Sequence, residues 1–182
     1  MKAWTNTELG YGNVAVLLHW GMAVLLLLLL AMGLYMVTLP EVGFDQHKIT
    51  LILVHKALGF VALGAVLARM AWRLGNVLPA LAAGLPEWQQ LAARVVHLWF
   101  YALMLALPLT GWVMSSAGGY PVSFFGVVLP DLVAVNQQHF RLWIDVHRWL
   151  GYALAALLVV HAGAALHHAF IERDDTLRKI LF

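Results

Sequence analysis

The chain has 182 residues, of which 63% are hydrophobic and 11% charged, and its formal net charge is +2. A soluble domain averages about 45–50% apolar and ~25% charged residues. This composition, with a mean hydropathy of +0.82, therefore excludes a soluble globular domain and indicates an integral membrane protein. The absence of cysteine excludes disulfides, thiolate-ligated iron–sulfur clusters and thiolate haem ligands. No nucleic-acid partner is expected.

Four apolar runs are long enough to cross a bilayer, since a membrane helix needs ~20 mostly apolar residues. They predict helices over residues 14–38, 49–72, 94–114 and 143–168. We therefore expect an all-α fold, an integral membrane four-helix bundle in contact with lipid, with a single domain over residues 1–182. The polar lead over residues 1–13 does not resemble a cleavable signal peptide, so we expect the first helix to be retained.

The first predicted helix carries His19 in its first turns and then six consecutive leucines, Leu25–Leu30, which are typical of a lipid-facing surface. It ends at Leu39-Pro40, because proline removes a backbone donor and stops a helix. A short loop is expected over residues 41–48.

The second predicted helix has His55 near its start and Arg69 and Arg73 at its end. A connection with Gly and Pro follows, and residues 85–93 are expected to lie along the membrane interface as a short amphipathic piece. The third helix has His97 near its start. After it, residues 115–138 lack a clean run of ~18 apolar residues, so we expect an interfacial flap and not a fifth span.

Orientation follows from the distribution of Lys and Arg, because cytoplasmic loops carry the excess of basic residues. With four helices, the side that holds both termini has seven basic residues. The opposite side has four, which are Lys48, Lys56, Arg141 and Arg148. We therefore expect both termini in the cytoplasm.

The fourth predicted helix carries two histidines inside its apolar run, His147 and His161. Their spacing, at about 100° per residue, leaves both imidazoles within roughly 40° of one face. A rise of ~1.5 Å per residue separates them by about 21 Å along the axis. Ionisable side chains inside a membrane are costly and usually functional. One helix thus offers two ligand positions at two membrane depths.

Depth in the membrane assigns each of these histidines a partner. His19 and His161 lie a few residues from the cytoplasmic face, whereas His55 and His147 lie a few residues from the opposite face. The sequence therefore predicts two facing pairs, His19/His161 and His55/His147, about 20 Å apart.

Two facing imidazoles at one depth of a helical bundle are typical of a haem with both axial positions filled, which suits electron transfer rather than oxygen binding. Zinc or di-iron bundle sites need further ligands, such as Glu-x-x-His pairs, and the apolar spans hold almost no carboxylates. The pattern therefore predicts two stacked haems. Their propionates would meet basic residues at the span ends, either Arg69 or Arg73 inside, and Lys56, Arg141 or Arg148 outside.

The other histidines are open to plainer interpretations. Any one intramembrane histidine could simply hydrogen-bond a neighbouring helix, although the matched pairs disfavour this for all four. His97 has no opposite partner left, so it is as much a candidate for a helix–helix hydrogen bond or a quinone site as for a ligand. His167 and His168 fall at the end of the last helix, where solvated residues are expected. His47 and His139 are expected in loops.

Four segments, taken in order, carry a resemblance to a known family. They are VAVLLHWGMAVLLLLL (residues 14–29), His55 followed by Arg69 and Arg73, HLWFYALMLALPLTGWVM (residues 97–114), and VHRWLGYALAALLVVHAGAALHHAFIERDDTLRKIL (residues 146–181). The third is similar to a His-x-x-x-Tyr…Ala-Leu-Pro…Gly pattern, and the fourth is the most similar of all. Together they resemble the bacterial cytochrome b561 family over nearly the whole chain.

The resemblance implies a dihaem b-type cytochrome, a multi-pass protein of the bacterial inner membrane, whose haem iron ligands are His19, His55, His147 and His161. It implies a superoxide oxidase-like activity, in which periplasmic superoxide gives up an electron and ubiquinone is reduced. Related cytochrome subunits serve hydrogenases and formate dehydrogenases. An alternative is therefore a cytochrome b subunit that links a partner dehydrogenase, hydrogenase or periplasmic carrier to the quinone pool.

In the superoxide hypothesis, a basic rim at the outer face raises the local concentration of a small anion, and its members are Lys48, Lys56, Arg141 and Arg148. His97, His167 and His168 are candidates for quinone binding or proton delivery at the inner face, because imidazole titrates near neutrality. The subunit hypothesis predicts a co-purifying protein partner, and a homo-oligomer is also open. A third hypothesis is a membrane scaffold or transporter with structural histidines, which predicts a colourless protein.

Overall fold

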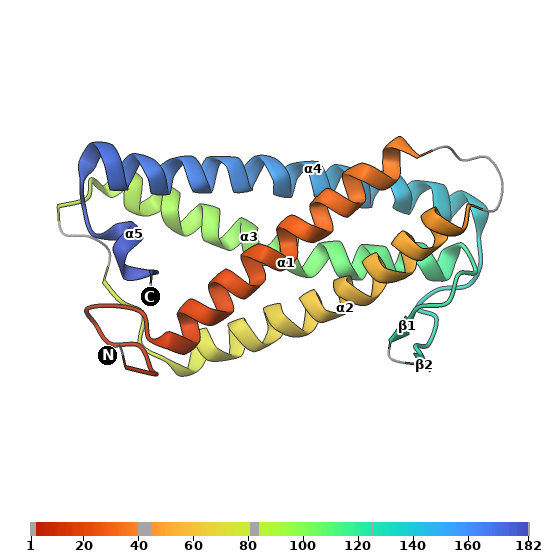
Figure 1. Ribbon diagram of the computed structural model, residues 1–182, viewed down its shortest axis with the longest axis horizontal. Coiled ribbons are helices and arrows are strands. Elements are labelled where there is room, and N and C mark those ends of the chain that lie inside the picture. Colours follow the sequence, from red (N-terminus) through yellow and green to blue (C-terminus); the bar gives the residue numbers. More distant parts are fainter. Residues whose placement is uncertain (1–2, 40–44, 81–83, 125, 182) are drawn as a thin grey trace.

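The computed structural model describes residues 3–39, 45–80, 84–124 and 126–181, and four long helices dominate it (Figure 1). Each helix is long and apolar enough to cross a membrane, which confirms the predicted all-α four-helix architecture. The helices pack in chain order, each on the next. They are α1 (Asn13–Thr38), α2 (Gln46–Gly75), α3 (Glu87–Ala117) and α4 (Gln137–His167).

The two ends of the bundle differ in what caps them (Figure 1). Both chain termini lie at one end, here called the termini end, where α1 and α3 begin and α2 and α4 finish. A short β-hairpin lies at the other end, here called the hairpin end, where α2 and α4 begin. An even number of spans places the two termini on the same side of a membrane.

Two helices begin earlier than hydropathy predicts, because capping side chains and not apolar runs set their first residues. Asp45 caps α2 by accepting a hydrogen bond from the backbone N–H of His47. Asn136 caps α4 by accepting from the N–H groups of Gln138 and His139. The expectation that His47 and His139 lie in loops is therefore wrong, since both lie in the first turn of a helix.

The third helix also begins early, at Glu87, directly after Pro86. A glutamate in the first turn favours a helix start because it complements the helix dipole. The separate interfacial piece predicted over residues 85–93 is therefore wrong, since residues 87–93 are the first turns of α3. The loop predicted over residues 41–48 is wrong from residue 46 onward, and residues 40–44 lie outside the described part of the chain.

The segment between α3 and α4 forms the hairpin. It contains β1 (Ser123–Phe124) and β2 (Val127–Val128), paired antiparallel with Phe124 opposite Val127. Gly126 in the turn has φ +83°, a backbone conformation that glycine adopts without steric cost. The flap predicted over residues 115–138 is thus present, but it is shortened at both ends by the longer helices.

Two hydrogen bonds hold the part of this flap that follows β2 against α3. The Trp112 indole N–H donates to the Pro130 carbonyl at 3.1 Å, and the Leu132 N–H donates to the Ser116 hydroxyl at 3.1 Å. Ser116 is buried, so these groups fix the flap on the end of the bundle and leave it little freedom.

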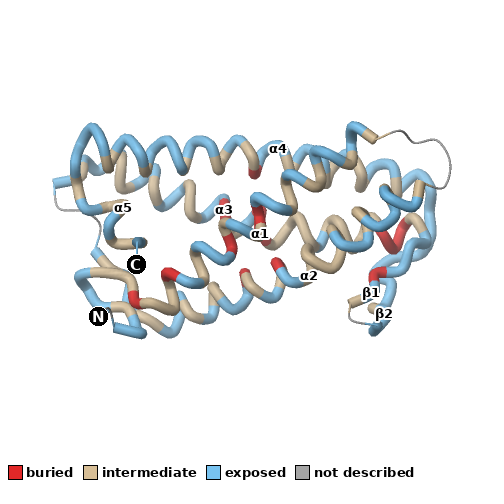
Figure 2. Tube along the Cα trace, viewed as in Figure 1, coloured by how far each residue is buried: buried red, intermediate tan, exposed pale blue. Residues whose placement is uncertain are grey.

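Few side chains are fully buried, and Figure 2 shows the helix surfaces mostly exposed or half-buried. This pattern is expected when lipid, and not protein, covers the outer faces of the helices. The buried core lies between the helices and consists of Met22, Leu26, Val66, Phe100, Leu103, Met104 and Leu154.

The C-terminal tail folds back over the termini end. After α4 the chain makes a π-helical turn, η1 (His168–Glu172), and then a short helix, α5 (Thr176–Lys179). The Trp20 indole N–H donates to the Ile180 carbonyl at 2.9 Å, and the Lys179 ammonium donates to the Ala80 carbonyl at 3.0 Å. These bonds tie the tail to the start of α1 and to the connection between α2 and α3.

Candidate cofactor sites at two histidine pairs

The structure brings together one of the two predicted pairs, His55 from α2 and His147 from α4, near the hairpin end. Their ring centres lie 6.2 Å apart and their planes cross at 80°. His55 Nδ1 is buried and finds no hydrogen-bond partner in the described part of the chain. An unpaired polar atom in such a place is costly unless a ligand or a solvent molecule satisfies it.

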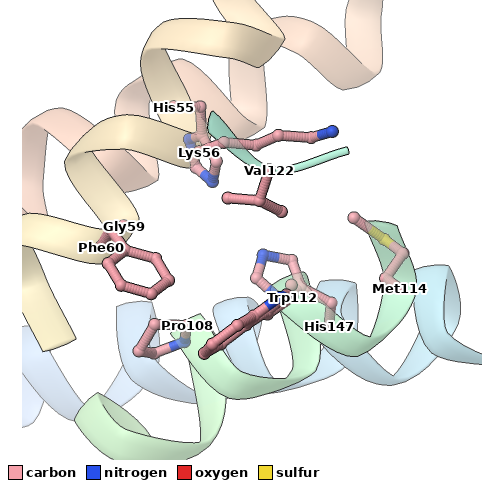
Figure 3. Close-up of a pocket in the computed structure, with 10 residues that line it drawn as sticks. His55, Lys56, Gly59, Phe60, Pro108, Trp112, Met114, Val122 and His147 are labelled. Carbon is pink, nitrogen blue, oxygen red and sulfur yellow. The ribbon is translucent and has the colours of Figure 1, made fainter. Parts of the chain in front are cut away.

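These two imidazoles project into a cavity of about 60 Å³ from opposite sides (Figure 3). Phe60, Trp112 and Val122 make its walls largely apolar. A Cβ atom on Gly111 would lie 3.3 Å from Cε1 of His147, so glycine gives the imidazole room against α3. An apolar lining with a few converging polar groups is typical of a cofactor or small-molecule site.

A neighbouring threonine sets the tautomer of His147. The Thr110 hydroxyl donates to the Leu107 carbonyl at 2.9 Å and lies 3.1 Å from His147 Nδ1. A hydroxyl has one proton, so the contact to the imidazole is made by an oxygen lone pair that accepts from Nδ1–H. In the neutral ring, Nε2 is then unprotonated and available to a metal.

The second predicted pair, His19 from α1 and His161 from α4, meets near the termini end. The ring centres lie 6.3 Å apart. Phe100 packs on His161 with 5.1 Å between ring centres. Arg69 from α2 reaches His19, with 3.1 Å between Nη2 and Nδ1. A guanidinium only donates, so here Nδ1 accepts and the proton of the neutral imidazole sits on Nε2.

His97, for which the sequence offered no opposite partner, lies beside the termini-end pair. Its ring centre lies 5.8 Å from that of His161, so three imidazoles and not two gather at this end. Arg69 and Arg73 both lie over the ring of Tyr101, at 5.9 and 5.8 Å from its centre. The termini-end site therefore contains two cations and a spare imidazole.

Both pairs fit a metal held between two imidazoles. An imidazole nitrogen binds a first-row metal at about 2 Å and lies about 1.2 Å from its ring centre, so opposed ligands put ring centres about 6.3 Å apart. The observed 6.2 and 6.3 Å agree with that value. An iron porphyrin uses such a ligand set, and the apolar cavity wall suits its ring.

Comparisons with known proteins decide the family. The family model described as prokaryotic cytochrome b561 matches residues 10–182. The chain belongs to the prokaryotic cytochrome b561 family. Members of this family are membrane cytochromes that bind haem b and transfer electrons, so the donor set found at the two pairs agrees with the family's cofactor. Four spans and a prokaryotic family together indicate an inner-membrane protein.

Three relatives illustrate the range of similarity. Cytochrome b561 homolog 2 of Escherichia coli (strain K12) is 33% identical over 180 residues, covering 98% of this chain and 95% of that protein. Cytochrome b561 homolog 1 of the same organism is 36% identical over 106 residues, 57% of this chain and 58% of that protein. The probable superoxide oxidase CybB of Yersinia pestis is 23% identical over 171 residues, 94% of this chain and 95% of that protein.

The four basic residues predicted at the outer face do not form one cluster. Lys56 lines the hairpin-end cavity, and its ammonium contacts the Tyr120 carbonyl at 3.4 Å. Arg148 pairs with Asp145 at 3.3 Å and is partly exposed. Arg141 is exposed near the start of α4, and Lys48 donates to the Leu39 carbonyl at 3.2 Å. Only Lys56 is part of the cavity lining.

Sequence reasoning missed Thr110 and Tyr120 as neighbours of the hairpin-end site. Neither has a signal in the sequence, because a threonine inside an apolar helix and a tyrosine in a loop are both common. Their contacts arise from how α3 packs against α4 and how the flap folds.

His167 and His168, predicted as candidates for quinone or proton chemistry, meet carboxylates at the end of α4. His168 Nδ1 lies 2.7 Å from Asp174 and 3.0 Å from Glu172. Burial disfavours the charged Asp174 carboxylate, but hydrogen bonds from Thr176 and His168 outweigh it and hold the pKa of Asp174 below its usual value. Asp174 is therefore a carboxylate at neutral pH.

Proposed function

We propose that this chain holds two b haems, one between His55 and His147 and one between His19 and His161. The observation that carries the proposal is the pair of ring-centre separations, 6.2 and 6.3 Å, with α4 supplying one histidine to each pair. When bound, haem would supply a one-electron carrier, held at each pair by the two imidazoles. Because α4 is one continuous helix, it fixes both ligand positions relative to each other.

At the termini end, we assign Arg69 and Arg73 to the haem propionates. If Nε2 of His19 held the haem, the proton of the neutral imidazole would lie on Nδ1, which could then not accept from Arg69. The guanidinium then turns to another acceptor, and a propionate is the charge-matched one. Tyr101 supports both guanidinium groups through its ring.

We propose superoxide as the donor, at the hairpin end, and ubiquinone as the acceptor. Two superoxide anions lose one electron each to give O2, and two electrons with two protons convert ubiquinone to ubiquinol. Lys56 beside the cavity supports this choice because it offers an anion a positive charge next to His55. The similarity to the probable superoxide oxidase of Yersinia pestis supports it as well.

The proposed orientation places the termini end in the cytoplasm and the hairpin end outside. The count of basic residues supports it, with seven on the termini side and four on the other. The flap, His55 and His147 then face the periplasm. His97 and the two arginines face the cytoplasm, where protons for quinone reduction are drawn from water.

Haem content tests the cofactor proposal. The detergent-purified chain should show the reduced α-band of a low-spin b haem after dithionite, and a pyridine haemochrome assay should give two haems per chain. One haem per chain would reduce the proposal to a single pair. A colourless protein from cells able to supply haem would contradict it and favour a scaffold or transporter.

Charge substitution tests the donor proposal. We expect Lys56→Gln with Arg148→Gln to slow haem reduction by superoxide about tenfold at low salt and to flatten the dependence on ionic strength. Arg94→Gln, a neutral change at the other end of the bundle, is the matched control. An unchanged rate and salt dependence would exclude electrostatic steering. No fast reaction in the native protein, with a co-purifying soluble subunit, would favour the role of a cytochrome subunit for a partner dehydrogenase.

A further inference from the structure

A cluster of three side chains at the termini end takes no part in the histidine pairs. His168 Nδ1 lies 3.0 Å from a Glu172 oxygen and 2.7 Å from an Asp174 oxygen, and the three ligand atoms lie within 4.8 Å of one another. The side chains are only 16, 28 and 18% exposed, in that order. Two carboxylates and an imidazole thus converge at the end of α4, with His168 and Asp174 half-buried and Glu172 the most exposed of the three.

An unusual local backbone brings these residues together. The π-helical turn η1 (His168–Glu172) widens the helix, and the residue after it, Arg173, has φ 55°. This left-handed conformation is unfavourable for a residue with a side chain. It reverses the chain so that the Asp174 N–H donates to the His168 carbonyl at 3.2 Å. Strained backbone of this kind is concentrated at functional sites.

Neighbouring groups orient both carboxylates. The Gln89 side-chain amide, from the first turn of α3, donates to Glu172 Oε1 at 2.9 Å. The Thr176 N–H donates to Asp174 Oδ1 at 2.8 Å. Each of these bonds uses the oxygen that does not face His168, so the remaining oxygens, Glu172 Oε2 and Asp174 Oδ2, both point at Nδ1. Metal-binding carboxylates are commonly held in this way by outer hydrogen bonds.

We propose that His168, Glu172 and Asp174 bind one zinc ion, with water as the fourth ligand. Zinc takes imidazole nitrogen and carboxylate oxygen at about 2.0–2.2 Å in tetrahedral geometry, which places neighbouring ligand atoms about 3.4 Å apart. The two distances from Nδ1 to the carboxylate oxygens, 2.7 and 3.0 Å, need to lengthen by about 0.7 and 0.4 Å to reach it. The imidazole favours zinc over Mg²⁺ or Ca²⁺, which prefer all-oxygen sites.

The site would fasten the C-terminal tail to the bundle. Glu172 already contacts α3 through Gln89, and Asp174 leads directly into α5. The tail after α5 receives the hydrogen bond from Trp20 of α1. A zinc ion at His168 would therefore stabilise the folded tail on the ends of three spanning helices. This inference does not rest on the proposed electron-transfer function, because the cluster shares no residue with either histidine pair.

Zinc counting tests the inference. The haem-loaded protein, purified through a tag without histidine and stripped with a chelator, is dialysed against Zn²⁺ with Mg²⁺ in excess. Zinc per chain is then measured by mass spectrometry, which separates it from haem iron. Asp174→Asn and His168→Ala are compared with Asp175→Asn, the same amide change at the neighbouring carboxylate, which instead lies 3.5 Å from Lys179. Circular dichroism and elution volume confirm that each variant is folded.

We expect one zinc per chain in the native protein and in Asp175→Asn, and binding about tenfold or more weaker in the two cluster variants. Zinc should also raise the melting temperature of the native protein and Asp175→Asn but not of Asp174→Asn. Three results would overturn the inference. They are no retained zinc, equal zinc in all variants, or displacement of zinc by Mg²⁺. Each result would leave the cluster as an ion pair in which two carboxylates share the imidazole proton.

Discussion

The two histidine pairs share α4 and nearly the same ring separation, yet their surroundings differ. The hairpin-end pair lies in an apolar cavity under a flap, with Thr110 accepting from His147 and a single cation, Lys56, in the lining. The termini-end pair has two arginines and a third imidazole around it. One helix therefore presents two histidines to two different electrostatic environments.

The difference teaches that ligand spacing and cofactor properties are set by separate parts of the chain. Spacing comes from α4 alone, because a rigid helix fixes the distance between His147 and His161. The protonation of the ligand rings comes from other helices, since α3 supplies Thr110 and α2 supplies Arg69. We expect the two arginines to raise the reduction potential of the termini-end haem above that of a haem in neutral surroundings. The reason is that nearby cations favour the reduced, electron-rich form.

The largest expected effect separates the two sites completely. His147→Ala should remove the hairpin-end haem and leave the other, whereas His161→Ala should do the reverse. Each variant should contain one haem per chain by pyridine haemochrome assay, with a redox titration that loses a different component in each case. Identical spectra and titrations from the two variants would show that the sites are not independent.

The spare imidazole predicts an asymmetry between the remaining ligands. The His55→Ala variant should lose the hairpin-end haem entirely, because no third histidine is among the residues that line that cavity. The His19→Ala variant should retain part of the termini-end haem, since His97 can take the place of His19. The ring centre of His97 already lies 5.8 Å from that of His161. The double variant with His97→Ala should then lose the rest. Equal losses in His19→Ala and His55→Ala would assign His97 a purely structural role.

A smaller effect tests the tautomer of His147. Thr110→Val removes the lone pair that accepts from Nδ1–H, and loss of such a partner typically weakens metal binding about 10–100-fold. Thr110→Ser keeps the hydroxyl and should restore binding. Haem titration of the protein monitored by absorbance measures both, and the termini-end haem should not change in either variant.

The smallest effect concerns space around the ring of His147. Gly111→Ala places a methyl group 3.3 Å from Cε1 of that ring and should modestly weaken or tilt the hairpin-end haem. Gly64→Ala makes the same change on α2, outside the cavity lining, and meets nothing within 4 Å, so it serves as the control. Electron paramagnetic resonance of the oxidised protein reports ligand tilt at each haem. A change in Gly64→Ala as large as that in Gly111→Ala would exclude the steric explanation.

The pairing of the histidines could be predicted because it depends on one-dimensional quantities. Span length, the position of each histidine within its span and the even number of spans fix membrane depth, and depth alone selects His19 with His161 and His55 with His147. Helix ends were predicted less well, because hydropathy marks only the apolar part of a helix. The polar first turns of α2, α3 and α4 are set by Asp45, Pro86 and Asn136.

Lateral neighbours were decided only by the tertiary structure. His97 has the same depth as His161, but depth says nothing of which helix faces are in contact, so its ring contact required the packing of α3 on α4. The cluster of His168, Glu172 and Asp174 depends on a π-helical turn and a left-handed arginine, which no periodic pattern predicts. The sequence by itself determined the class of protein, the number of spans and the depth of each paired histidine, because lipid solvation acts on each segment separately. The partners of Nδ1 in each imidazole, the flap over the cavity and the folded tail were decided by contacts between segments far apart in the chain.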